Sequence, residues 1–139
     1  MVRLPLSPNG IVEHLQRPIS ATELSEFLSL LSNRRRCLVI ISVFTLGPDE
    51  TVDLRTLSQQ IAHVETTKDP SEVTSDDRQT VYNNLHQNHL EQLADANMIE
   101  YEEDRKLVGR GSETTIAGIV LAAVVVILQF LRPRSRDSS

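Results

Sequence analysis

A row of carboxamide and hydroxyl side chains is the first feature of this sequence that can do chemistry. The row consists of Thr80, Asn83, Asn84, Gln87 and Asn88. At about 100° of rotation per residue, these positions gather on one side of a helix. Asn and Gln can form two hydrogen bonds with the N6/N7 edge of adenine in the major groove of DNA. The pattern predicts a base-reading face or, in the simpler interpretation, a neutral surface in water. Acidic Asp77 and Glu91 share this side and weaken the first interpretation.

Two short basic groups are candidates for phosphate contacts. They are the run Arg34, Arg35 and Arg36, and the pair Arg105 and Lys106 in a predicted turn. Such contacts position a protein on a duplex without specifying its sequence. Salt bridges are an equally good interpretation, because residues 20–108 hold 16 acidic and 8 basic side chains. An acidic domain repels nucleic acid, so this charge balance is the main objection to DNA binding.

Metal and catalytic chemistry find less support. His86 and His89 are one helical turn apart, and His63 and Cys37 can approach them in space, but closed zinc sites usually show tighter Cys or His pairing. We expect His89 to bond a backbone group in the core, Cys37 to be a small buried hydrophobe, and no metal or cofactor to bind. The phosphate-cradling GxxxxGK[ST], GxSxG and HExxH patterns are missing, so we expect neither an enzyme nor a small-molecule substrate.

Three helices are predicted before residue 67. Residues 20–31 have apolar side chains at helical spacing, with Thr22 as N-cap. A second helix runs from about residue 34 to 46 after a Ser32 or Asn33 cap, although its apolar middle, CLVIISVF, is also typical of a buried strand. Gly47-Pro48 ends it. A short strand is expected at residues 51–52. Asp53 then caps a third helix, whose shared apolar face is Leu54, Leu57, Ile61 and Val64.

The longest helix is predicted from about residue 75 to 96. Thr74 and Asp77 have the spacing of a capping box at its start, and Asn97 suits a left-handed C-cap. Its core side is expected to hold Val81, Tyr82, Leu85, His89, Leu93 and Ala96. Residues 98–101 alternate like a strand, residues 103–105 form a turn, and residues 106–108 return. A helix followed by a hairpin is the order of a winged helix-turn-helix domain.

The segments LSNRRR (31–36), TLSQQIA (56–62) and VTSDDRQTVYNNLHQNHLEQLADANMIEYEED (73–104) resemble a haloarchaeal winged-helix family. Its members are mostly of uncharacterised function and are often described as transcriptional regulators. The resemblance covers about 75 residues and is sharpest from Tyr82 to Tyr101, although Asn97 stands where such proteins commonly have Gly. It implies the fold strongly and DNA binding less strongly, because a fold does not fix function. A salt-adapted host would also explain the acidic surface.

The C-terminal region predicts membrane attachment. Residues 114–131 are almost entirely apolar and reach the lower end of the length of a membrane span. A buried oligomerisation helix or a central strand is the alternative. Three basic side chains on each flank leave the orientation undecided by charge, and we expect a cytoplasmic N-terminal domain because no export signal precedes it. The small residues Gly118, Ala122 and Ala123 suggest pairing of two such helices.

Together these patterns predict a mainly α (α+β) chain with five segments. They are a loose arm (1–19), a winged helix-turn-helix domain with a small hairpin (20–108), a flexible linker (109–113), a single transmembrane helix (114–131) and a basic tail (132–139). The predicted function is a membrane-tethered regulator that binds double-stranded DNA, with a homodimer as a further expectation. The alternative is a membrane-anchored protein-interaction module on the same scaffold, which the acidic balance favours.

Overall fold

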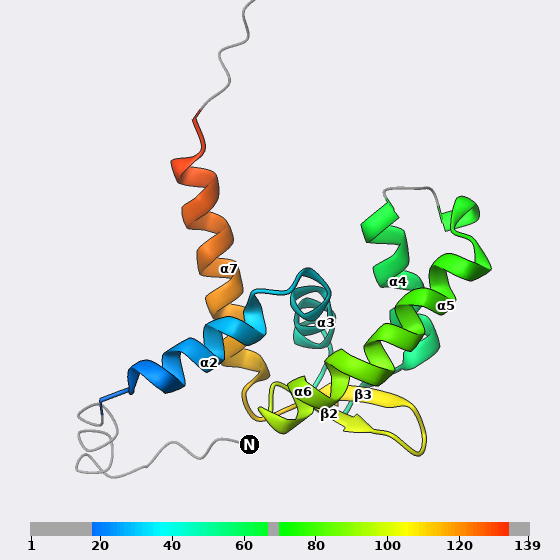
Figure 1. Cartoon of the computed structure of the whole chain (residues 1–139), viewed down its shortest axis with the longest axis horizontal. Helices are drawn as coiled ribbons and strands as arrows, with labels where there is room; N and C mark the ends of the chain where they lie inside the picture. The colour runs from blue at the N-terminus through cyan, green and yellow to red at the C-terminus, as the bar shows by residue number, and fades with distance from the viewer. Residues whose placement is uncertain (1–17, 67–69, 134–139) are drawn as a thin grey trace, which may run out of the picture.

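The structure, a computed structural model, places a bundle of helices above a small sheet (Figure 1), and it describes residues 18–66 and 70–133. The elements in chain order are α2 (Ala21–Leu31), α3 (Arg34–Phe44), β1 (Thr51–Asp53), α4 (Leu54–Thr66), η1 (Pro70–Glu72), α5 (Ser75–Asn84), η2 (Leu85–His89), α6 (Leu90–Asp95), β2 (Ile99–Glu102), β3 (Leu107–Arg110) and α7 (Thr114–Leu131). The predicted arm lies almost wholly outside the described residues, as does most of the basic tail.

The first two helices begin at side-chain caps. The Ser20 hydroxyl accepts the backbone N–H of Glu23 at 3.0 Å, so the predicted cap at Thr22 is wrong by two residues. The Asn33 carboxamide accepts the N–H groups of Arg35 and Arg36 and starts α3. The apolar middle of α3 is helical rather than extended, and Val39, Ile40 and Val43 lie in the core. These caps supply partners for N–H groups that have none inside the helix.

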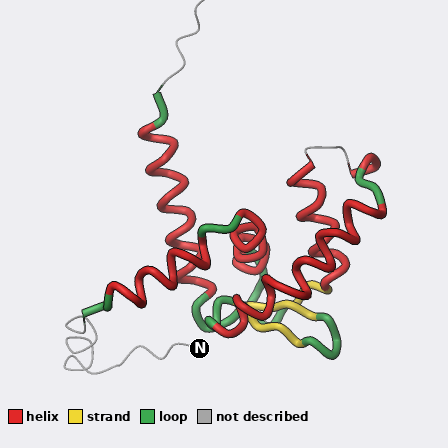
Figure 2. Tube along the Cα trace, in the orientation of Figure 1, coloured by secondary structure: helices red, strands yellow, loops and turns green. Residues whose placement is uncertain are grey.

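The sheet is antiparallel with strand order β1-β3-β2, and Figure 2 shows its strands in yellow. The short strand expected at residues 51–52 is confirmed, and Val52 pairs with Val108, which pairs with Tyr101 on its other side. Asp53 ends β1 and caps α4, because its carboxylate accepts the N–H of Thr56 at 3.0 Å and the Thr56 hydroxyl at 2.7 Å. The predicted hairpin is confirmed to within two residues.

Helical backbone continues from Ser75 to Asp95, but a π-helical turn at η2 interrupts its period. The predicted capping box between Thr74 and Asp77 is confirmed, as is a left-handed Asn97, with φ 61°, just after the helix. One extra residue in the turn shifts the following side chains around the axis. Leu90 is therefore fully buried, although the regular period did not place it in the core.

The core lies where α3, α4 and the long helix 75–95 meet the sheet. Its buried apolar members are Val39, Ile40, Val43, Leu54, Leu57, Ile61, Ala62, Val73, Val81, Leu85, Leu90, Leu93, Met98, Ile99, Val108 and Ala117. The prediction for α4 needs one correction, since Val64 is half-exposed and Ala62 is buried in its place. Burial of these apolar side chains provides the main driving force for folding.

The predicted flexible linker at residues 109–113 is wrong. Gly109 and Arg110 belong to β3, and the N–H of Glu113 donates to the carbonyl of Asn97 at 2.8 Å. The Thr114 hydroxyl donates to the carbonyl of Met98 at 2.6 Å and is fully buried. These bonds join the start of α7 to the folded domain.

Helix α7 packs on α3 through its first turns and then leaves the domain (Figure 1). Gly118 lies against the Phe44 ring, where an added Cβ would stand 2.1 Å from a ring carbon. Gly118 therefore serves packing within the chain, which corrects its predicted role in pairing two membrane helices. Among the described residues, α7 is the one helix long and apolar enough to cross a membrane.

Candidate nucleic-acid interface

The outward side of the long helix carries most of the predicted polar row. Thr80, Asn83, Gln87 and Asn88 are all exposed, in agreement with the prediction. Gln79, which the prediction omitted, is also exposed and donates from Nε2 to Oδ1 of Asn83 at 2.9 Å. We call these five side chains the α5 face. Their amides are able to donate and accept hydrogen bonds, as base reading requires.

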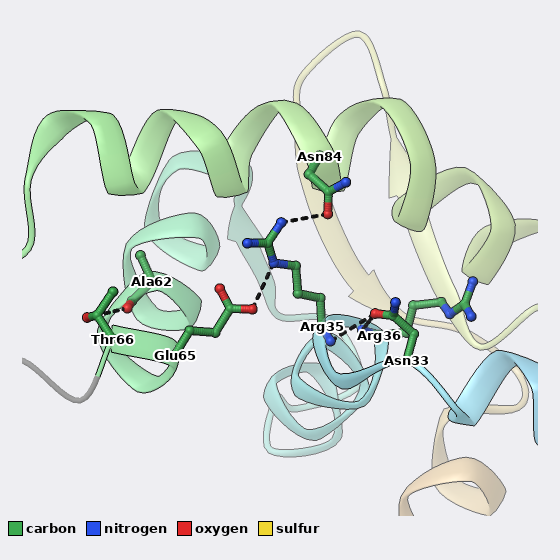
Figure 3. Close-up of polar contacts among 7 residues, drawn as sticks. All are labelled: Asn33, Arg35, Arg36, Ala62, Glu65, Thr66 and Asn84. Carbon is green, nitrogen blue, oxygen red and sulfur yellow. Dashed lines mark hydrogen bonds and ion pairs between the residues drawn. The ribbon is translucent and has the colours of Figure 1, made fainter.

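Asn84 does not belong to this face. Its Oδ1 accepts a hydrogen bond of 2.8 Å from Nη1 of Arg35, so its side chain is turned toward α3 (Figure 3). Nε of the same arginine donates to Oε1 of Glu65 at 2.7 Å. Arg35 thereby links α3, α4 and α5 from a part-buried position. The predictions of a base contact for Asn84 and of a phosphate contact for Arg35 both conflict with these bonds.

Arg36 is also engaged within the domain. Its guanidinium donates to Oε1 of Gln92 and, at 3.1 Å, to the carbonyl of Ser29. Arg34 is the exposed member of the run. The structure therefore leaves one of these three predicted phosphate contacts free at the surface.

Two other arginines lie beside the α5 face, and the sequence interpretation missed them. Arg55 comes from the first turn of α4 and Arg78 from the start of α5. Both line a cleft of about 400 Å³ between these helices. The complete lining is Arg55, Ser58, Gln59, Ser75, Arg78, Gln79 and Tyr82. The two guanidiniums are far apart in sequence, so no basic run marked them.

Lys106 extends this basic edge to the hairpin. It lines a neighbouring cleft together with Arg55, Gln79 and Tyr82. Its carbonyl accepts the N–H of Leu54 at 2.9 Å, which fixes the hairpin to the start of α4. Its φ of 54° is left-handed, a conformation that tight turns require and that most side chains disfavour. We call Arg55, Arg78 and Lys106 the basic edge.

Carboxylates border the basic edge on the hairpin side. Arg105 lies 3.7 Å from Glu102 in an exposed ion pair, and Glu103 and Asp104 are exposed next to it. Hydrogen bonds from the Thr56 hydroxyl and N–H lower the pKa of Asp53, so this carboxylate stays ionised beside the second cleft. The hairpin tip therefore repels phosphate more than it attracts it, and Lys106 is its better-placed cation.

The histidines and the cysteine do not form a metal centre in the part of the chain that the structure describes. His89 is buried, but its Nδ1 has no partner there, so the predicted backbone bond is wrong for that atom. Burial lowers the pKa of His89, and Arg36 and Arg35 lower it further against an opposing effect of Glu65. His86 instead forms a hydrogen bond of 2.8 Å through Nδ1 with the hydroxyl of Tyr101, and burial raises the pKa of Tyr101 to about 12.

Cys37 is half-buried rather than a full core residue. Its Sγ donates to the carbonyl of Leu31 at 2.9 Å. Burial raises the pKa of the thiol, and the charge of Arg36 partly opposes this shift. The thiol is therefore mostly protonated near neutral pH, a poorly reactive form.

Comparison with known proteins identifies one family. The model of a family described as a domain of unknown function (DUF7344) matches residues 28–109, which is more than half of the chain. The matched segment runs from α2 to β3 and includes the α5 face and the basic edge. No curated protein and no solved structure matches the chain.

Proposed function

The chain belongs to the DUF7344 family of domains of unknown function, and we propose that it is a membrane-tethered winged-helix protein that binds double-stranded DNA and regulates transcription. The order of α4, the long helix 75–95 and the β2–β3 hairpin, with β1 completing the sheet, supports a winged helix-turn-helix. In that arrangement, the long helix enters the major groove and the hairpin lies beside the adjacent backbone.

The observation that carries the proposal is the position of the basic edge along the α5 face. Arg55 on α4, Arg78 on α5 and Lys106 in the hairpin turn line adjoining clefts beside Gln79. Contacts from the cations to phosphates would set the position of the helix, and the amides would reach base edges. This division of roles replaces the predicted one, in which the run at the start of α3 held the phosphate backbone.

Helix α7 supports the tether. It spans 18 residues, and its mean hydropathy is 2.5. At 1.5 Å per residue it is about 27 Å long, close to the thickness of the hydrocarbon core. We place the N-terminal domain in the cytoplasm, where it meets DNA. Protease treatment of intact cells should leave this domain uncut, and its removal would contradict the orientation.

The test in cells is crosslinking of the tagged full chain to DNA in its host, followed by sequencing of the recovered fragments. We expect discrete enriched sites for the wild-type protein and loss of enrichment when Arg55→Gln and Arg78→Gln are combined. Arg34→Gln removes one exposed positive charge from α3 and serves as the control for loss of a surface arginine outside the basic edge. Recovery no greater than from an untagged strain would contradict DNA binding.

The carboxylates at the hairpin tip favour a second candidate, a membrane-anchored module that binds a basic protein partner. Glu103→Lys with Asp104→Lys distinguishes the two functions, because both residues are exposed at the tip. If the hairpin faces DNA, the reversal removes repulsion and strengthens duplex binding. If the acidic tip binds a protein, the same reversal abolishes capture of that protein and leaves duplex binding absent.

A further inference from the structure

The first turns of α7 hold part of α3 at the level of the membrane span. Gly118 is the fifth residue of the helix and touches the Phe44 ring, about 6 Å along the axis from its start. Arg110 reinforces this junction, because Nη1 donates to the carbonyl of Phe44 at 2.7 Å and Nη2 to the Thr115 hydroxyl. A span that begins at Thr114 therefore brings the C-terminal end of α3 to the edge of the bilayer.

The free part of α7 is too short to account for the whole apolar layer. The contact with the domain extends to Leu121, which packs against the core, so the free residues 122–131 are about 15 Å long at 1.5 Å per residue, whereas the hydrocarbon core is about 30 Å thick. Apolar surface from the domain has to cover part of the difference, or the bilayer has to become thinner around the helix.

Such surface is present on α3 and α2. Ile41 and Phe44, one turn apart on α3, are 47% and 37% exposed. Leu24 and Leu28, one turn apart on α2, are each 51% exposed. Helix α2 packs on α3 and contains no fully buried residue. The contact with α3 therefore covers only part of the apolar side of α2, and Leu24 and Leu28 remain exposed.

When α7 is tilted, the arrangement of the helices also places the apolar surface of α2 and α3 nearer to the bilayer than the polar turn η1. In Figure 1, α7, the C-terminal end of α4 and the turn η1 rise on one side of the sheet, while α2 extends away from α4 and η1. An upright α7 would carry the polar turn η1 toward the depth of the bilayer. Membrane helices commonly tilt by up to about 40°. A tilt that moves η1 out of the bilayer moves α2 toward the bilayer surface, because η1 and the N-terminal end of α2 lie on opposite sides of α7 (Figure 1).

We propose that Leu24, Leu28, Ile41 and Phe44 contact lipid, so that α2 and the end of α3 lie in the headgroup–acyl boundary. This inference rests on the tether in the proposed function. Apolar side chains of interfacial helices reach about 5–10 Å into that boundary. Glu23 and Glu26 are exposed on α2, so anionic headgroups do not attract it. Apolar burial drives the contact, and zwitterionic lipid is sufficient.

Single-tryptophan reporters test the contact, because the chain has no tryptophan. The full chain is reconstituted in phosphatidylcholine vesicles with plain or brominated acyl chains. Leu28→Trp and Ile41→Trp report on the proposed surface, and Val64→Trp on α4, which is 48% exposed, is the matched control. Phe130→Trp on α7 reports on the tether. We expect bromine to remove roughly half of the emission at residues 28 and 41, because they lie within reach of the acyl chains, and little at residue 64.

The reporters separate the two claims. Suppose that bromine quenches the tryptophan at position 130 but quenches those at positions 28 and 41 no more than the one at position 64. The surface contact is then refuted and the tether stands. If residue 130 is not quenched either, both the contact and the tether are refuted. A blue-shifted emission at residue 28 that bromine leaves unchanged would mean that protein, such as a second copy of the chain, covers α2, and would also overturn the proposal.

Discussion

The start of α3 and the edge of the α4–α5 cleft both carry arginines, but the fold uses them differently. At the start of α3, Arg35 and Arg36 bond to Glu65, Asn84, Gln92 and a backbone carbonyl. At the cleft, Arg55 and Arg78 line open space beside exposed amides. Arg35 and Arg36 thus join helices, whereas Arg55 and Arg78 face a cleft, where their one side-chain bond among the described residues is a local bond of 3.2 Å from Nη2 of Arg78 to the Ser75 hydroxyl.

A contiguous run of basic residues in the sequence therefore does not show which arginines a ligand can reach in the folded protein. A guanidinium bonded to acceptors on two neighbouring helices keeps free N–H groups, but these bonds hold it inside the domain and away from a phosphate at the surface. Arginines at the start of α3, α4 and α5 all lie in the first turn of a helix, so the acceptors on neighbouring elements decide which of them are engaged.

The largest effect is expected from Arg55→Gln combined with Arg78→Gln. Loss of two phosphate contacts should weaken duplex binding by about 10- to 100-fold near physiological salt and reduce the slope of log affinity against log salt by about two. Fluorescence anisotropy of a labelled duplex with the full chain in lipid nanodiscs measures both. The free energy of unfolding should change by less than about 0.5 kcal/mol. Unchanged affinity would remove the basic edge from the account.

Arg35→Ala should show the opposite behaviour. It leaves the Glu65 carboxylate and the Asn84 carboxamide without their shared donor, and should lower the free energy of unfolding by about 1–2 kcal/mol, discounted because the pair is only part-buried. Denaturant titration measures the loss, with Arg34→Ala as the control. Duplex affinity should change by less than about twofold. A large loss of affinity at unchanged stability would contradict the structural role.

Burial of His89, with a smaller contribution from Arg36 and Arg35, should make the free energy of unfolding depend on pH. Burial, followed by Arg36 and Arg35, lowers the pKa of His89 in the folded state. As pH falls below about 6.5, the unfolded chain binds a proton that the folded chain still excludes, so the unfolded state gains stability. Stability should fall between pH 7 and pH 5. A denaturation series with His89→Gln should lack this component, and an equal pH dependence in the variant would exclude His89 as its origin.

The smallest effect is expected at the hairpin tip. Arg105 is exposed and paired with Glu102 at 3.7 Å, so Arg105→Gln should weaken duplex binding by less than about twofold. Lys106→Gln, next to the cleft, should cost several-fold, in keeping with one lost phosphate contact. Paired anisotropy titrations at one salt concentration compare the two. Equal losses would mean that the whole tip, acidic residues included, faces the phosphates.

Local signals predicted most of the fold. Asp53, the Thr74–Asp77 box and Asn97 each act through neighbours within three residues, so the sequence reveals them directly. The π-helical turn leaves no comparable signal, because nothing in a regular period announces one extra residue. The inward positions of Leu90 and Asn84 were missed in the region around that turn.

Contacts between distant segments account for the remaining errors. The stretch GRGSE has the composition of a linker, yet the carbonyls of Asn97 and Met98 hold its end and Thr114. The sequence around Gly118 is typical of a surface that pairs with another helix, but the Phe44 ring of the same chain covers this glycine. One practical consequence follows for experiments: a fragment ending at residue 112 would lose buried Thr114 and Ala117, so binding has to be measured on the full chain.

The most direct test of the central claim is the salt dependence of duplex binding by the wild-type full chain in lipid nanodiscs. Three phosphate contacts from Arg55, Arg78 and Lys106 predict saturable binding whose log affinity falls with log salt at a slope of about −2.7. Absence of saturable binding at low salt, or a slope near zero, would contradict the assignment of the α5 face and its basic edge to DNA.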